Sequence, residues 1–430
     1  MKHVKIPFQQ TQLSNGLRVF VHEDPRTPVA CVNLWYFVGS KDERAGRTGF
    51  AHLFEHLMFE GSGNVHKGQF DELLEAVGGG NNGSTSPDRT NYWETVPANA
   101  LQLPLFLESD RMGWFLETIT QEKLDGQRDV VKNERLQSYE NRPYGLAYET
   151  TMKHLYPPSH PYHWPVIGWM ADLDAATLAD VRSFFATYYA PNNATLAVAG
   201  AIEANAVFEL AEHYFGSIAP VPAPPRPVVP DATLAADVVL AMEDAVHLPR
   251  LYMSWHSPRI FAEGDAELDI AARVLASGKT ARLYQRLVHD LEIAQDVEAE
   301  QESGLLTSTF SLSVTAREGI SLARIHDEVQ RVLSETMAQL NARELERARN
   351  HIETATLDAV QSVGGFGGKA DRLNHYFFYA QDPGYLETDL QRYALLTPEH
   401  VRNWLGALTA TSAVTLSVVP HGHMELAVRA

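Results

Sequence analysis

Apolar residues recur along this chain with two different spacings, which predict a mixture of strands and amphipathic helices. Short continuous apolar runs at residues 32–38 and 194–201 are typical of buried strands. Residues 90–96 are rich in β-branched and aromatic side chains and predict another strand. Residues 121–140 instead place apolar positions at helical spacing. The pattern therefore predicts an α/β protein.

A proline-rich run at residues 220–230 divides the chain near its middle. So many prolines favour an extended, semi-rigid linker over a core element. A chain of 430 residues is long for one hydrophobic core, and two or three domains are expected. We predict an N-terminal half at 1–218, a linker at 219–235 and a C-terminal half at 236–430.

Composition narrows the class of protein. A formal net charge of −19 disfavours nucleic acid as a partner, because phosphates would be repelled over most of the surface. The charge is compatible with attraction of basic peptide segments, although solubility explains it equally well. The single cysteine, Cys31, excludes an intrachain disulfide.

Hydropathy along the chain predicts no membrane span, because no stretch approaches about 20 apolar residues. The first ten residues have no apolar core of a secretory signal. We expect a cytoplasmic protein, or a periplasmic one if a signal segment has been removed.

Two histidines and a glutamate lie within the five residues 52–56. A helix is expected to begin just before them, with Thr48 as its N-cap. On that helix His52, Glu55 and His56 share one face, while apolar residues such as Leu53 and Leu57 cover the other. Two neutral imidazoles one turn apart can bind a metal ion, and the carboxylate can accept a proton from water at the metal. The order H-x-x-E-H is the reversed, inverzincin form of the zinc-protease motif, although a purely structural His-Glu-His helix gives the same pattern.

A tetrahedral catalytic zinc needs a third protein ligand. In the helix predicted at 121–140, a stripe at i, i+3, i+4 and i+7 ends in a carboxylate; its members are Gln127, Val130, Val131 and Glu134. Burial of that carboxylate calls for a compensating partner, which a metal would provide. Asp129 and Glu122 are competing acids off the stripe, and pairing of Glu134 with Arg128 or Arg135 remains an alternative.

These motifs together resemble the pitrilysin (insulinase-like) family of zinc metallopeptidases. The resemblance includes His52–His56 and the segment 127–134, and it is closest to the family's short-chain branch, to which the mitochondrial processing peptidase belongs. Further matching segments lie at 78–85, 88–92, 141–145 and 189–194. The likeness covers nearly the whole chain, strongly in the first half and as a pattern in the second.

The resemblance implies that His52, His56 and Glu134 bind one zinc ion per chain and that Glu55 is the general base. It implies that Asn82 and Gly83 run alongside a bound peptide. The strand predicted at 90–96 offers an edge to which a peptide could add as a further strand, or is an ordinary sheet strand.

The family's fold is implied as well: two similar α/β (α+β) halves, each a mostly antiparallel sheet packed with helices. A helix at 265–275 would take the place of the zinc helix in the second half. That helix has no H-x-x-E-H, so only one metal site is expected.

Two departures from the family pattern matter for activity. Gln127 stands where many members have a second glutamate, so it can hydrogen-bond near the site but adds no charge. Single-chain members carry an arginine and a tyrosine seven residues apart in the second half, and the matching positions here are Val288 and Gln295. The resemblance therefore implies a heterodimer with a homologous partner subunit that supplies the missing pair. A homodimer is the alternative, and it would need another source of these donors.

Some other motifs are discounted. The segments 277–280 and 364–369 imitate phosphate-binding loops but lack a required glycine and a hydroxyl residue respectively. Arg372 and Tyr376 could act as a substitute pair on a helix, although packing and surface roles explain them better.

The sequence thus predicts a zinc-dependent metalloendopeptidase subunit that hydrolyses peptides and is completed by a partner. The alternative is a non-catalytic scaffold or assembly subunit of the same fold. Such relatives usually lack some of the metal-site residues, whereas this chain has all four.

Overall fold

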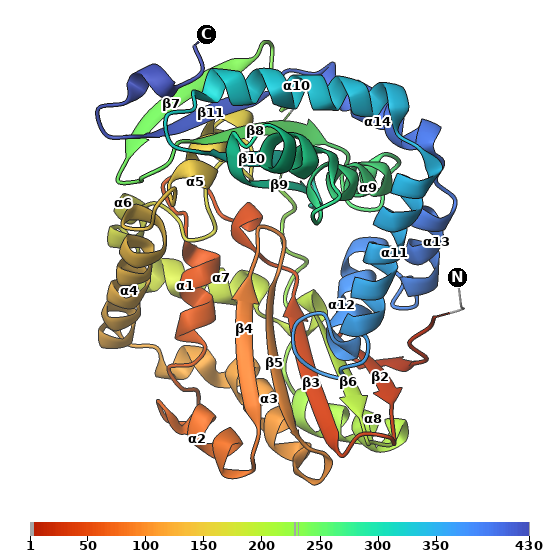
Figure 1. Cartoon of the computed structure of the whole chain (residues 1–430). Helices are drawn as coiled ribbons and strands as arrows, with labels where there is room; N and C mark the ends of the chain where they lie inside the picture. Colours follow the sequence, from red (N-terminus) through yellow and green to blue (C-terminus); the bar gives the residue numbers. More distant parts are fainter. Residues whose placement is uncertain (1–3, 228, 231, 430) are drawn as a thin grey trace. The chain divides into compact units, whose positions relative to one another are not determined.

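A computed structural model describes residues 4–227, 229–230 and 232–429. These residues form two compact units, each built on a β-sheet covered by helices (Figure 1). The first unit takes in the described residues of 1–134, 164–228 and 355–387, and the second those of 135–163, 229–354 and 388–430. The units therefore draw on segments from both sides of the predicted linker, and the division at 219–235 stays a prediction. Residues 228 and 231 of that linker lie outside the described residues, and no helix or strand is found in its described part.

The sheet of the first unit has the order β1-β2-β6-β3-β5-β4 in the part of the chain that the structure describes. Its strands are β1 (Gln9–Gln12), β2 (Arg18–Glu23), β3 (Val29–Tyr36), β4 (Gly80–Thr85), β5 (Thr90–Pro97) and β6 (Ala194–Gly200). Only the β2–β6 pair among them is parallel. The strands predicted at 32–38, 90–96 and 194–201 are confirmed as β3, β5 and β6.

The edge of this sheet differs from the prediction. The suggestion that residues 90–96 offer an exposed edge is wrong, because β5 pairs with β3 on one side and with β4 on the other. The outermost strand on this side of the sheet is β4, which carries Asn82 and Gly83. Its sequence, Gly-Asn-Asn-Gly-Ser-Thr, has low strand propensity and gave no signal of its own.

The sheet of the second unit has the order β7-β11-β8-β10-β9 among the described residues. Its strands are β7 (Val238–Asp244), β8 (Arg250–Ser257), β9 (Ala294–Glu302), β10 (Ser308–Ala316) and β11 (Val414–Pro420). Only the β7–β11 pair of this order is parallel. This is the same arrangement as β2-β6-β3-β5-β4 in the first sheet, with each strand number raised by five. The predicted pair of similar, mostly antiparallel halves is therefore confirmed.

Helices cover both sheets. Those with all their residues in the first unit are α1 (Phe50–Leu57), α2 (Gln69–Ala76), α3 (Gln102–Thr118), α6 (Met170–Asp174), α7 (Leu178–Tyr188), α8 (Ala204–Phe215) and α12 (Lys369–Ala380). Those of the second unit are α5 (Ala147–Leu155), α9 (Asp265–Ala276), α10 (Leu322–Gln339) and α14 (Pro398–Thr409). Three helices run across a boundary between the units: α4 (Gln121–Arg135), α11 (Ala342–Ala359) and α13 (Leu386–Ala394).

Helices α1 and α9 occupy equivalent places in the two units. Strands β3 and β8 are equivalent in the two sheet orders, and α1 is the first α-helix after β3 while α9 is the first after β8. The helix predicted at 265–275 is therefore confirmed as α9. None of the helices in the described part of the chain has the length and apolar character needed to cross a bilayer.

Candidate metal centre

Helix α1 is amphipathic, and its apolar side is anchored in the core of the first unit. Phe50, Leu53, Phe54 and Leu57 are all buried. The ring of Phe54 stacks on that of Tyr189 with centroids 5.2 Å apart. Burial of these side chains fixes the rotation of the helix, so its other side presents the histidines and the glutamate of the motif.

The start of α1 is held by acceptors from outside the helix. Its N-cap is Gly49 in a left-handed conformation with φ of 84°, and the prediction of Thr48 as N-cap is wrong. The carboxylate of Glu43 accepts hydrogen bonds from the backbone N–H groups of Gly49 and Ala51, at 2.9 and 2.8 Å. The hydroxyl of Thr48 instead donates to Asp172 at 2.7 Å. Glu43 lies six residues before Gly49, whereas a capping side chain is usually sought at the N-cap position itself. The sequence pattern therefore does not reveal it.

We predict that Glu43→Ala lowers the free energy of unfolding by about 1–2 kcal/mol, because two N–H groups at the helix start lose their acceptor. Chemical denaturation monitored by circular dichroism measures this. Glu43→Gln is the matched control, since its amide oxygen can still accept. An unchanged midpoint in Glu43→Ala would contradict this role of the carboxylate.

Helix α4 lies beside α1 (Figure 1), and Glu134 is its second-to-last residue. One of its carboxylate oxygens, Oε2, is 3.7 Å from Nε2 of His52 and 3.4 Å from Nε2 of His56. The ligand atoms of the three residues lie within 4.8 Å of one another, and this is the one group of its kind found among the described residues. The structure therefore brings together the three residues that the sequence selected from positions far apart.

This donor set fits zinc. Tetrahedral coordination at Zn–N and Zn–O distances near 2 Å places neighbouring ligand atoms about 3.3 Å apart, close to the two observed separations. Burial, together with the charge of His56, lowers the pKa of His52 to about 4. The hydrogen bond from His56 lowers the pKa of Glu134 despite partial burial. Neutral imidazole and ionised carboxylate are the forms that bind metal.

Glu55 lies on the same face of α1, and its carboxylate is held by the edge strand. The hydroxyl of Thr85, the last residue of β4, donates to Oε2 of Glu55 at 2.6 Å. Burial raises the pKa of Glu55, and the Thr85 hydrogen bond opposes this shift. Sequence reasoning missed Thr85, because its approach to Glu55 depends on how β4 lies along α1.

The two residues predicted to line the peptide lie at this edge as well. A Cβ atom at Gly83 would be 3.1 Å from Oε1 of Glu55 and 3.2 Å from the ring of Tyr92, so a side chain there would crowd the carboxylate. Asn82 is exposed and accepts a hydrogen bond from the N–H of Gly83 through its side-chain oxygen. Of these two residues, Gly83 is thus the one at which an added side chain would meet Glu55.

The predicted stripe on α4 is only partly buried. Val131 is buried, whereas Val130 is 45% exposed. The amide of Gln127 donates to Glu60 at 2.7 Å rather than to one of the three metal-ligand candidates. Arg128, a predicted alternative partner of Glu134, pairs with Asp125 at 2.8 Å.

The two positions that match the family's arginine and tyrosine lie in the second unit. Val288 packs against the hydrophobic core of that unit, and Gln295 is exposed at the start of β9. Tyr376, the tyrosine of the substitute pair, is fully buried on α12 in the first unit.

Two sequence models of one peptidase family match this chain. The one described as "Insulinase (Peptidase family M16)" matches residues 18–156, and the one described as "Peptidase M16 inactive domain" matches residues 175–352. The chain belongs to the pitrilysin (insulinase-like) family, peptidase family M16. The metal-ligand candidates and Glu55 all fall in the part matched by the first of these models.

Named relatives and solved structures agree with this membership. The chain is 29% identical to the zinc protease PqqE of Helicobacter pylori over 367 residues, which cover 83% of this chain and 82% of that one. Its fold matches a crystal structure of a protease from Helicobacter pylori with a TM-score of 0.89 and 25% identity, over 97% of this chain and all of that one. A peptidase M16 inactive domain from Pseudomonas fluorescens matches in fold with a TM-score of 0.84 and 19% identity, over 96% and 98% of the two chains.

Proposed function

We propose that this chain is a zinc-dependent metalloendopeptidase subunit in which His52, His56 and Glu134 hold one zinc ion and Glu55 is the general base. The observation that carries the proposal is the grouping of three ligand atoms within 4.8 Å beside the carboxylate of Glu55. Relatives named zinc proteases support the choice of metal and of reaction.

Zinc bound by such a set supplies a Lewis acid that polarises a carbonyl group and makes water more acidic. Transfer of the proton would be carried out by Glu55. Oε2 of Glu55 accepts a hydrogen bond from Thr85, which fixes the plane of the carboxylate and leaves Oε1 beside Gly83. In this proposal Oε1 takes a proton from the attacking water and passes it to the leaving amine.

The peptide would bind along β4. As one of the two edge strands of its sheet among the described residues, β4 can pair its backbone with an extended peptide without fixing the peptide's sequence. Pairing at Asn82–Gly83 would bring a peptide bond next to Glu55, since Gly83 lies beside Oε1.

We predict that Gly83→Val lowers kcat/KM by at least about tenfold while zinc content stays unchanged, because the added side chain displaces the Glu55 carboxylate. Steady-state assays on a fluorogenic peptide, with zinc measured on the same samples, provide the test. Gly80→Val, on the same strand with open space around the added Cβ, is the matched control. Equal losses in both variants would argue against a specific effect on Glu55.

We also propose that a homologous subunit supplies the arginine and tyrosine donors. Support comes from Val288 and Gln295, which stand at the family's positions for that pair and cannot donate as arginine and tyrosine do.

The experiment that tests this function is a peptidase assay of the chain purified from its native source. Cleavage of an unfolded protein is followed by mass spectrometry, with and without the chains that co-purify. We expect cleavage that requires the co-purifying chain and is absent in a His52→Ala protein. Strong cleavage by the chain alone as a monomer would contradict the partner, and no cleavage under either condition would contradict the peptidase.

A further inference from the structure

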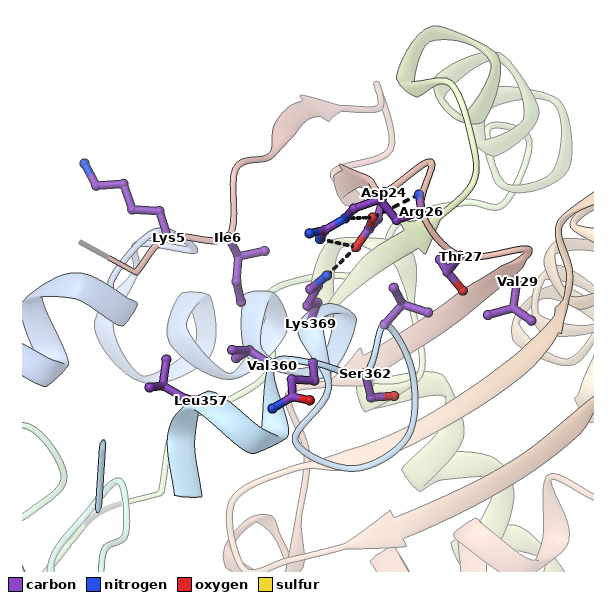
Figure 2. A pocket seen from close by; sticks show the side chains of 12 residues that line it. Lys5, Ile6, Asp24, Arg26, Thr27, Val29, Leu357, Val360, Ser362 and Lys369 are labelled. Carbon is purple, nitrogen blue, oxygen red and sulfur yellow. Dashed lines mark hydrogen bonds and ion pairs between the residues drawn. The ribbon is translucent and has the colours of Figure 1, made fainter. Parts of the chain in front are cut away.

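A cavity lies in the first unit, lined by none of the metal-ligand candidates. It is a cavity of about 590 Å³ bounded by Lys5 and Ile6, by the turn from Asp24 to Val29, and by residues 357–363 with Lys369 (Figure 2). The turn joins β2 to the start of β3, whereas the segment that leads to α1 leaves the other end of β3. The two ends of this strand are roughly 23 Å apart at 3.3 Å per residue. The cavity is therefore separate from the candidate metal centre.

Two cations share one carboxylate at the wall of this cavity. Arg26 donates from Nε and Nη2 to the two oxygens of Asp24, at 2.8 and 2.9 Å. The ammonium of Lys369, which is almost fully buried, donates to the same carboxylate at 2.5 Å. Figure 2 shows Asp24 between the two cations. The hydrogen bonds from Arg26 and then Lys369 hold the pKa of Asp24 well below its usual range, so the group of three carries one surplus positive charge.

A third cation stands at the rim. Lys5 forms an ion pair with Glu387 at 2.9 Å, and its side chain is 67% exposed. Such exposed ion pairs contribute little to stability. Lys5 can therefore turn from Glu387 towards an anion in the cavity at a small cost in free energy.

The remaining wall is largely apolar. Ile6 and Val363 are buried, and Val29, Leu357 and Val360 also line the cavity. Convergent positive charge beside an apolar wall suits a ligand with a negative head and an apolar body. One surplus charge matches a monovalent carboxylate better than a phosphate dianion, which the net charge of −19 would also repel.

We propose that this cavity binds a carboxylate carried on an apolar chain, with Arg26 and Lys5 pairing with the carboxylate. Arg26 retains N–H donors beyond the two that it gives to Asp24, and a guanidinium can pair with carboxylates through more than one edge. The apolar chain would lie against Leu357, Val360 and Val363. Two sources offer this chemistry, the C-terminus of an apolar peptide and a fatty acid. The proposal does not depend on peptidase activity.

Isothermal titration calorimetry on the full chain tests this site with three probes: N-acetyl-valyl-leucine, its C-terminal amide and octanoate. We expect at least one of the two carboxylates to bind, with a Kd at least tenfold lower than that of the amide and rising with salt concentration. Binding of the peptide acid alone identifies a peptide C-terminus as the source, and binding of octanoate alone identifies a fatty acid.

Two variants with exposed side chains localise the binding without disturbing the fold. Arg26→Gln should raise the Kd at least tenfold and Lys5→Gln at least threefold, because each removes a cation from the cavity. Arg182→Gln, an exposed arginine of α7 outside the cavity, should leave the Kd unchanged. The proposal is overturned if neither carboxylate binds at millimolar concentration, if the amide binds equally well, or if Arg26→Gln binds like the unaltered chain.

Discussion

Replacing Glu55 by glutamine is expected to lower kcat by about 10³-fold while zinc stays bound. The amide keeps the shape of the side chain and can still accept the hydrogen bond from Thr85, but it cannot take up a proton. The three metal-ligand candidates are unchanged, so zinc content should remain one per chain. The loss should appear in kcat more than in KM, because the proton is transferred in the reaction rather than in binding.

Steady-state kinetics on a fluorogenic peptide, together with zinc analysis of the same protein, measures both quantities. Glu75→Gln is the matched control, an exposed glutamate of α2 in the same unit, and should behave like the unaltered chain. Full activity in Glu55→Gln with zinc bound would show that Glu55 is not the base.

The second large effect concerns the metal itself. His56→Ala should reduce zinc from one per chain to below about 0.1 and abolish cleavage, because two protein ligands remain where a tetrahedral site needs three. Exhaustive treatment of the unaltered chain with a chelator should have the same effect on activity, and added zinc should restore it. The unfolding temperature should also fall on metal removal, since bound metal stabilises the folded state by mass action.

Elemental analysis and thermal unfolding follow these changes. His213→Ala, an exposed histidine of α8, is the control and should keep its zinc. If His56→Ala kept a full complement of zinc, the metal would have to be bound elsewhere in the chain.

Features set by local spacing were predictable from the sequence. Helical periodicity alone places His52, Glu55 and His56 on one face of α1, and the apolar residues between them anchor the opposite face. The buried strands β3 and β6 follow from continuous apolar runs for the same reason. The stripe on α4 made Glu134 a candidate, but only the resemblance joined it to His52 and His56, since its approach to α1 depends on how two distant helices pack.

Features set by tertiary pairing were not predictable. Strand β4 is rich in glycine and asparagine and forms because β5 pairs with it, so the edge of the sheet was assigned to the wrong strand. The N-cap of α1 was misplaced because the carboxylate of Glu43 supplies the acceptor from outside the helix. Val130 points to solvent although it shares a helical stripe with buried Val131, because only part of that stripe meets the core.

Gln127 stands where many members of the family have a glutamate, and its hydrogen bond shows how the glutamine fits this chain. Its amide donates to the carboxylate of Glu60, which is buried and also pairs with Lys67 at 2.8 Å. A glutamate at 127 would place two carboxylates together at this point, with repulsion between them. The glutamine is therefore consistent with the local charge, and Glu134 and Glu55 remain the carboxylates of the candidate metal centre.

The proposed peptidase activity depends on zinc bound between His52, His56 and Glu134. The most direct measurement is X-ray diffraction from crystals of the zinc-containing chain at wavelengths on either side of the zinc absorption edge. We expect one anomalous peak per chain within about 2.3 Å of Nε2 of His52, Nε2 of His56 and a carboxylate oxygen of Glu134. A zinc-containing crystal with its peak at any other set of residues, or with none at these three, would contradict it.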